Sequence, residues 1–335
     1  MIANVAVLGG GAWGTALAVH LATRTHERAH ITLYMRSAAL ARDCVAAREN
    51  RRYLPRIALP PSIGITADLA DVVSADLLIA ATPVAQLLPL TDALHERCIA
   101  APLISLSKGF VATPDAAQNW SLPHRALGAR WKAPVGTITG PTFAVEVAQG
   151  LPTALVVAST DAALTRDVAA LLRGDALRAY PSDDLAGIET GGAVKNVFAI
   201  AAGASDGLGF GDNARAALIT RGLAESGRLS DALGGKRETL MGLAGLGDLV
   251  LTCTGNLSRN RRVGLALSRG QPLAAILAEI GHVAEGVLAT RAANDLARQL
   301  GIDMPIVDAV HRVLYDRLPP RDAVLALLAR EPRAE

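Results

Sequence analysis

The sequence predicts an α/β fold with a doubly wound sheet, followed by a second domain built only of helices. Short apolar runs of strand type alternate with helical stretches from Val5 to about Tyr180. From about Asp184 the alternation stops, and long stretches with apolar residues at helical spacing take over. Alternating strands and helices are typical of a sheet with helices packed on it. We therefore expect two domains, at residues 1–184 and 185–335.

The first element is a strand at residues 5–8, which leads into a glycine-rich turn and a helix of small residues. Gly9, Gly11 and Gly14 have the spacing G-x-G-x-x-G of a Rossmann-type dinucleotide turn. Gly9 permits the tight turn, Gly11 lets backbone N–H groups approach a pyrophosphate, and Gly14 lets the helix lie close to the strand. The helix start adds partial positive charge and free N–H donors. The pattern favours dinucleotide binding over a plain strand–helix turn.

The second strand, at residues 30–36, indicates which dinucleotide is bound. In the NAD-preferring form of this unit, an acidic residue about 20 positions beyond the glycines binds the ribose 2′-OH. Here the strand ends in Arg36, and no acidic residue stands there. A guanidinium at this place can pair with the 2′-phosphate of NADP, so we expect NADPH as the cofactor, with NADH also accepted. The alternative is a solvated arginine at a strand end.

The remaining strands are continuous apolar runs, as expected for parallel strands that are buried on both faces. A loop is expected at residues 50–55 and 59–61. The expected strands are 63–66, 75–81, 103–106, 135–139, 153–158 and 177–180. The segment Gly-Pro-Thr-Phe-Ala at residues 140–144 is expected to form a strand-to-helix turn.

The helical half shows apolar residues at helical spacing in several long stretches. Helices are expected at residues 192–204, 215–233, 272–279, 287–300 and 305–315. Pro305 suits the first turn of the last of these helices, and Gly301 suits the end of the helix before it.

The composition excludes several classes of function. The net charge is only +2, which does not favour nucleic acid or an acidic membrane surface as a partner. No apolar stretch approaches the roughly 20 residues that span a bilayer, and no signal peptide is evident. The three cysteines lack C-x-x-C spacing, which fits a reducing cytoplasm, and no metal-binding pattern is present. We expect a cytoplasmic homodimer without metal that acts on a small molecule.

Only four of the 33 basic residues are lysines, and one of them stands in an apolar setting. Lys195 lies in the segment Gly-Gly-Ala-Val-Lys-Asn-Val-Phe, which is expected to be helical. Burial lowers the pKa of a lysine towards the range of a general acid or base. The alternative is a lysine whose stem is buried and whose head reaches solvent. Asn196 either orients a ligand oxygen or caps a neighbour.

Three other segments carry candidate functional groups. Asp248, in a glycine-rich turn, either pairs with Lys195 or caps the following helix. Ser258, Arg259 and Asn260 combine a helix cap, a guanidinium and an amide, which together suit an anion. The alternative for this cluster is a solvated basic helix start. Lys108, just beyond a strand end, is either a substrate ligand or a surface lysine.

Together these segments resemble the bacterial NAD(P)-dependent glycerol-3-phosphate dehydrogenases. The blocks that carry the resemblance follow the family's order, at residues 9–14, 105–109, 140–144, 191–196, 205–207, 213–215, 245–249 and 258–260. The resemblance implies a Rossmann domain followed by a helical domain. It also implies reduction of dihydroxyacetone phosphate to sn-glycerol 3-phosphate, which supplies phospholipid synthesis.

The resemblance also assigns roles to individual residues. Lys195 is implied as the proton donor and acceptor, with Asp248 beside it. The implied substrate contacts are Lys108, Gly140, Thr142, Lys195, Asp248, Ser258, Arg259 and Asn260. The implied cofactor contacts, besides the glycines, are Trp13, Arg36, Lys108, Ala144, Arg259, Val283 and Glu285.

The chain departs from the family pattern in two places. Residues 115–134 contain Trp120, Pro123 and Trp131 where a more regular sequence is usual, and Ala12 stands where serine is frequent. These differences affect local cofactor contacts and the outer sheet.

Two alternative functions remain open from the sequence. One is another reductase of this architecture, such as a β-hydroxyacid dehydrogenase or a ketopantoate reductase, and the other is a non-catalytic NADP sensor. The cluster at residues 258–260 suits a phosphate better than a carboxylate, which favours the glycerol-phosphate reading.

Overall fold

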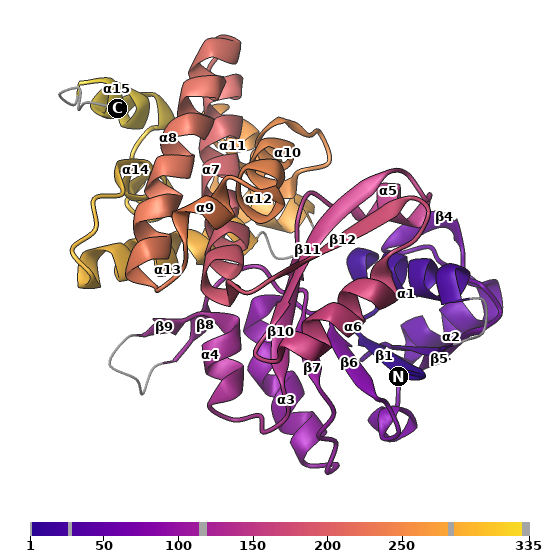
Figure 1. The fold of residues 1–335 in the computed structure, drawn as a ribbon. Helices are drawn as coiled ribbons and strands as arrows, with labels where there is room; N and C mark the ends of the chain where they lie inside the picture. The colour runs from indigo at the N-terminus through magenta and orange to yellow at the C-terminus, as the bar shows by residue number, and fades with distance from the viewer. Residues whose placement is uncertain (1, 26–28, 114–118, 281–284, 330–335) are drawn as a thin grey trace. The chain divides into compact units, whose positions relative to one another are not determined.

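The computed structural model describes residues 2–25, 29–113, 119–280 and 285–329 (Figure 1). The chain forms two compact units. The first contains Met1–Ser107 and Leu122–Leu185, and the second contains Lys108–Ser121 and Ala186–Glu335. The division near residue 185 lies close to the expected boundary. The assignment of Lys108–Ser121 to the second unit is a difference, because this segment interrupts the strand–helix alternation of the first.

The first unit is built on an eight-stranded sheet with the strand order β12-β11-β10-β7-β6-β1-β2-β5. The strands are β1 (Asn4–Leu8), β2 (His30–Tyr34), β5 (Ile63–Thr66), β6 (Leu77–Ala80), β7 (Leu103–Ser105), β10 (Val135–Thr139), β11 (Thr153–Ser159) and β12 (Leu177–Ser182). All neighbours run parallel except β10 and β11, which are antiparallel. Each expected strand is present, and the outer pair reverses the direction of the series.

The helices of this unit lie on both faces of the sheet. They are α1 (Ala12–Thr25), α2 (Ala38–Ala47), α3 (Leu87–His95), α4 (Pro123–Gly128), α5 (Ala144–Ala148) and α6 (Ala162–Leu172), with short turns at Leu69–Val72 and Val84–Gln86. The strand order steps in one direction from β1 to β2 and in the other from β6 to β7. Because parallel crossovers are right-handed, α1 and α3 lie on opposite faces. The carboxyl ends of β1 and β6 meet where the order reverses, the usual ligand position in such sheets.

A small hairpin of β3 (Glu49–Asn50) and β4 (Leu54–Ala58) occupies part of the expected loop. The loop prediction is wrong at Asn50, Leu54 and Pro55, which lie in these strands, and is confirmed at residues 51–53 and 59–61. Most of β4 is exposed, and it includes Pro55, so it lacks the continuous apolar run of the other strands. Such short, polar strands carry little periodic signal.

The second unit consists of helices and one short hairpin. The hairpin joins β8 (Val111–Ala112) to β9 (Trp120–Ser121). The helices are α7 (Leu185–Gly207), α8 (Gly211–Ala232), α9 (Arg237–Leu240), a π-helical turn at Leu243–Gly247, α10 (Asp248–Thr254), α11 (Arg259–Ser268), α12 (Leu273–Ile280), α13 (Glu285–Gln299), α14 (Pro305–Tyr315) and α15 (Pro320–Leu328). None of the described helices is long and apolar enough to cross a membrane.

Helix α7 is buried along most of its length and begins seven residues before the expected start at residue 192. Gly191 lies inside α7, where a Cβ atom would come within 2.7 Å of the carbonyl oxygen of Ala244. The glycine therefore serves the close approach of a second backbone segment.

Candidate active site

The glycine-rich turn of the first unit has the geometry that its sequence predicts. Gly9 has a φ of +132°, and its N–H donates to the carbonyl oxygen of Tyr34 at 2.9 Å. A Cβ atom at Gly9 would lie 2.5 Å from the carbonyl oxygen of Ala81, and one at Gly14 would overlap the backbone of Gly9. A Cβ atom at Gly11 would meet nothing within 4 Å. The turn is thus packed on its protein side and open at Gly11, where a pyrophosphate would approach the start of α1.

Asn50 fixes the outer side of this turn, and the sequence analysis did not find it. Its Nδ2 atom donates to the carbonyl oxygen of Gly10 at 2.9 Å and to Oγ1 of Thr15 at 2.8 Å. Its Oδ1 atom accepts from the N–H of Tyr53 at 3.3 Å. Asn50 is fully buried, so the hairpin is anchored to the turn by a satisfied amide.

The other cofactor candidates of the first unit lie near the carboxyl ends of strands. Arg36 follows β2, is exposed, and donates through Nη1 to Oε1 of Gln86 at 2.9 Å. Trp13 is half-buried near the start of α1, and Ala144 is the first residue of α5. Arg36 is therefore a solvent-facing guanidinium with one neutral partner.

The segment after β10 forms the expected strand-to-helix turn. Gly140 has a φ of +143°, and a Cβ atom there would lie 2.9 Å from Cα of Leu155. Oγ1 of Thr142 donates to the carbonyl oxygen of Gly140 at 3.1 Å. The turn thus depends on glycine for its backbone conformation.

The second unit holds a buried cluster of two lysines and one aspartate. Nζ of Lys195 donates to Oδ1 of Asp248, and Nζ of Lys108 donates to Oδ2 of the same carboxylate at 2.6 Å. Lys195 is 7% exposed and Asp248 is 1% exposed. The N-cap of α10 is Gly247 and Asp248 is the first residue of the helix, so Asp248 is not the N-cap. The surface-lysine alternative for Lys108 is wrong as well, because only 13% of its side chain is exposed.

Burial and the second lysine shift the protonation of this cluster. Burial lowers the pKa of Lys195 to about 7, and the positive charge of Lys108 acts in the same direction. Asp248 acts in the opposite direction on Lys195. Burial acts to raise the pKa of Asp248, but the charges of Lys108 and Lys195 hold it below its usual range. The cluster therefore combines a stable carboxylate with an amine that can exchange a proton near neutral pH.

The anion cluster lies at the start of α11 and is bonded directly to α7. Ser258 caps α11, as expected, and its Oγ accepts from the N–H of Arg261 at 3.2 Å. Nδ2 of Asn260 donates to Oδ1 of Asn196 at 2.9 Å, and Oδ1 of Asn260 accepts from the N–H of Gly286 at 3.1 Å. The Nδ2 atom of Asn196 is buried and has no partner among the described residues. An unpaired buried donor beside Lys195 suits a ligand oxygen.

Two further cofactor candidates belong to this region of the chain. Arg259 is exposed at the first position of α11. Glu285 is half-buried at the start of α13, and burial raises its pKa while the charges of Arg259, Lys108 and Lys195 act to lower it. Val283 lies outside the described residues. In the described part of the chain, no group of His, Cys, Asp and Glu side chains is arranged to hold a metal ion.

Comparisons with known proteins identify relatives over nearly the full length. Residues 4–165 match the family model of the NAD-dependent glycerol-3-phosphate dehydrogenase N-terminus, and residues 184–325 match that of its C-terminus. The glycerol-3-phosphate dehydrogenase [NAD(P)+] of Aromatoleum aromaticum is 50% identical over 336 residues, which cover 99% of this chain and 100% of the relative. The crystal structure of the Coxiella burnetii glycerol-3-phosphate dehydrogenase is 39% identical, with a TM-score of 0.91 over 98% of this chain and 99% of that one.

The reductase named as an alternative shares only the fold. A probable 2-dehydropantoate 2-reductase from Bacillus subtilis is 15% identical, with a TM-score of 0.56 over 93% of this chain and 99% of that one. Identity at this level shows common architecture alone.

Proposed function

The chain belongs to the NAD-dependent glycerol-3-phosphate dehydrogenase family, and from that premise we propose that Lys195, Asp248 and Lys108 are its acid–base centre. The protein is an NAD(P)-dependent enzyme that interconverts dihydroxyacetone phosphate and glycerol 3-phosphate. The proposal is carried by one observation, the buried carboxylate of Asp248 held between two lysine amines.

The proposed proton transfer follows from the charges of this cluster. NAD(P)H, when bound, supplies the hydride that adds to the carbonyl carbon. As negative charge develops on the carbonyl oxygen, the ammonium of Lys195 donates a hydrogen bond and then its proton to that oxygen. Asp248 holds the Nζ atom of Lys195 in place, and Lys108 adds positive charge. Lys195 is left neutral and takes a proton from water before the next turnover.

Ser258, Arg259 and Asn260 are proposed to hold the substrate phosphate. The capped start of α11 presents backbone N–H groups, and Arg259 adds a forked cation beside the Asn260 amide. Fixing the phosphate also fixes the carbonyl carbon at a set distance from it, and such positioning contributes ~7–11 kcal/mol in favourable cases. Gly140 and Thr142 complete the proposed substrate contacts.

NADPH is proposed as the preferred cofactor, with NADH accepted. The open face at Gly11 supports dinucleotide binding, and Arg36, which stands where an NAD-preferring unit has an acidic residue, supports the preference for NADPH. Trp13, Ala144, Lys108, Arg259, Val283 and Glu285 are the remaining proposed cofactor contacts. Loss of NADPH absorbance with dihydroxyacetone phosphate, run beside NADH and beside unphosphorylated dihydroxyacetone, tests both the substrate and the cofactor. Equal rates with the two ketones would contradict the proposed phosphate site.

The protein is further proposed to be a cytoplasmic homodimer that supplies phospholipid synthesis. Its cysteines Cys44, Cys98 and Cys253 are free, which fits a reducing compartment. The exposed apolar side chains of Met241, Val250 and Leu257 on the second unit suit a subunit contact. Light scattering after size-exclusion chromatography distinguishes a dimer from a monomer.

A further inference from the structure

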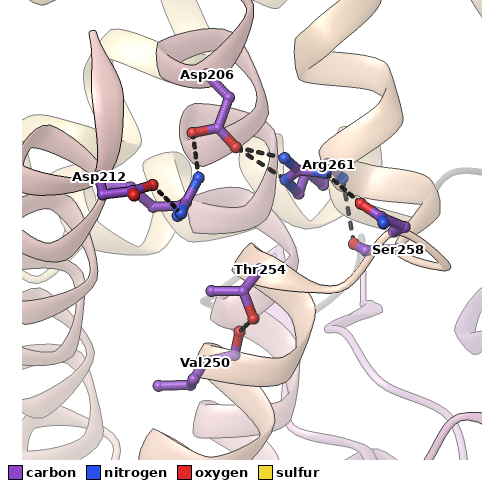
Figure 2. A network of polar contacts seen from close by, with 8 residues as sticks. Asp206, Asp212, Val250, Thr254, Ser258 and Arg261 are labelled. Carbon is purple, nitrogen blue, oxygen red and sulfur yellow. Dashed lines mark hydrogen bonds and ion pairs between the residues drawn. The ribbon is translucent and has the colours of Figure 1, made fainter.

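Asp206 is a buried acidic side chain near the end of α7 that the proposed reaction does not use. Its side chain is only 9% exposed. Oδ2 accepts from Nε and Nη2 of Arg261 at 2.9 Å and 2.6 Å, and Oδ1 accepts from Nη1 of Arg215 at 2.8 Å. Figure 2 shows the contacts of the Asp206 carboxylate with the guanidinium of Arg261 as dashed lines. Both carboxylate oxygens are thus engaged by cations.

Arg261 connects this carboxylate to the start of α11. Its backbone N–H donates to the capping Oγ of Ser258, and its Nη1 donates to Oδ1 of Asn256 at 3.2 Å (Figure 2). Two of its guanidinium nitrogens are bound to one oxygen of Asp206, which fixes the plane and direction of the group. Arg261 is therefore held in a single orientation, directly after Arg259 and Asn260 in the chain.

The backbones of α7 and α11 touch at the same place. A Cβ atom at Gly203 would overlap the carbonyl oxygen of Arg261, and one at Gly264 would overlap that of Ile200. The contact fixes the distance between the two helices but leaves sliding and rotation to be set by side chains. The bond from Arg261 to Asp206 and the bond from Asn260 to Asn196 lie at opposite ends of this contact along α7. Two such points determine the register of one helix on the other.

We propose that Asp206 is a positioning residue for the phosphate of the substrate, acting through Arg261 to hold Ser258, Arg259 and Asn260 in register with Lys195. The substrate class concerned is a small ketone or alcohol that carries a phosphate monoester. The proposal rests on the proposed phosphate role of Arg259 and Asn260, and it assigns Asp206 no direct contact with the substrate.

The test compares Asp206→Asn with Asp212→Asn in the full-length enzyme. Asn keeps the size of the side chain but removes its charge. Asp212 provides a matched control, because it bonds Arg215 from an 87% exposed side chain. Asp206→Asn is expected to raise the KM for dihydroxyacetone phosphate about tenfold or more, the scale of a lost charged hydrogen bond. The same variant should change three other quantities by less than about threefold: kcat, the Kd for NADPH, and kcat/KM for unphosphorylated dihydroxyacetone. Asp212→Asn should leave these three quantities and the KM for dihydroxyacetone phosphate unchanged.

Arg261→Lys is the second variant, because it keeps the positive charge and loses the forked geometry. It should show the same phosphate-specific defect, and the effects of the two changes on that KM should be less than additive in the double variant, because both disrupt the bonds between Asp206 and Arg261. If Asp206→Asn does not fold, as judged by circular dichroism, Arg261→Lys carries the test alone.

Arg259→Ala separates failure of this inference from failure of the proposed phosphate site. If Arg259→Ala raises the KM for dihydroxyacetone phosphate while Asp206→Asn and Arg261→Lys do not, the positioning role is refuted and the phosphate site stands. If Arg259→Ala has no effect on that KM, the phosphate site itself is wrong. If Asp206→Asn lowers kcat/KM equally for the phosphorylated and the unphosphorylated ketone, Asp206 has a general structural role and the proposal is overturned.

Discussion

Nζ of Lys108 lies 2.6 Å from Oδ2 of Asp248, on the opposite oxygen of the carboxylate from the one that accepts Lys195. One carboxylate thus divides its negative charge between two amines. The ammonium form of Lys195 is therefore stabilised less than it would be in an ion pair with Asp248 alone. The positive charge of Lys108 also repels this ammonium. The arrangement keeps Lys195 oriented without fixing its proton.

Replacement of Lys195 by alanine should abolish most turnover. We expect kcat to fall by ~10²–10⁴-fold, the usual contribution of a positioned acid or base. The Kd for NADPH, measured by fluorescence titration, should stay within about threefold of the parent. Lys132→Ala is the matched control, because Lys132 is exposed. Near-normal turnover of Lys195→Ala would refute the assignment of Lys195.

The rate of ketone reduction should fall as pH rises through about 7. Lys195 must carry its proton to donate it, and burial lowers its pKa to about 7. Above that value, kcat should decrease about tenfold per pH unit, while the reverse oxidation, which needs the neutral amine, should increase. Asp248→Asn removes the charge that raises the pKa of Lys195, so in this variant the fall of kcat with rising pH should begin at lower pH. If the fall begins at the same or a higher pH, a group other than Lys195 controls it.

Arg36→Ala should weaken NADPH binding selectively. Loss of a charged hydrogen bond to the 2′-phosphate costs ~1.5–3 kcal/mol, which corresponds to a rise in Kd of about 10- to 100-fold. NADH lacks this phosphate and provides the internal control, because its Kd should change little. Calorimetric titration with both cofactors measures the difference. If the Kd values for NADPH and NADH rise equally, Arg36 binds a part of the dinucleotide that both cofactors contain.

Asn50→Asp should weaken the binding of both cofactors. The carboxylate keeps an acceptor for the N–H of Tyr53 but loses the donors to the Gly10 carbonyl and to Thr15. Because the buried carbonyl would then face a negative oxygen, the turn should shift, and the Kd values for NADPH and NADH should rise together by about tenfold or more. Arg51→Ala is the control, since the Arg51 side chain is 75% exposed. Unchanged Kd values for both cofactors would show that the turn holds its shape without Asn50.

The sheet was predictable because its strands are short apolar runs bounded by glycine, proline and polar residues. The residues at β5 and β10 match the expected ranges. The hairpin at Glu49–Ala58 was missed because its arginines and Pro55 break the alternation of apolar and polar residues that predicts a strand. The early start of α7 was missed because Gly191, a weak helix former, is kept for its backbone contact with Ala244.

Within the site, residues were predictable where local chemistry is unusual. Lys195 could be singled out because a lysine among small apolar residues is rare, and Ser258 because it has the features of a helix cap. The bond between Lys108 and Asp248 joins residues 140 positions apart, and no local pattern reveals it. The same applies to Asp206 and Arg261, which are 55 positions apart.

The grouping of Lys108–Ser121 with the helical unit means that the polypeptide passes from one unit to the other three times, after Ser107, Ser121 and Leu185. A gene cut at the third passage would therefore yield a helical fragment without Lys108, leaving Asp248 with one amine in place of two. A chimaera that takes its helical unit from a relative would therefore have to take residues 108–121 from the same relative.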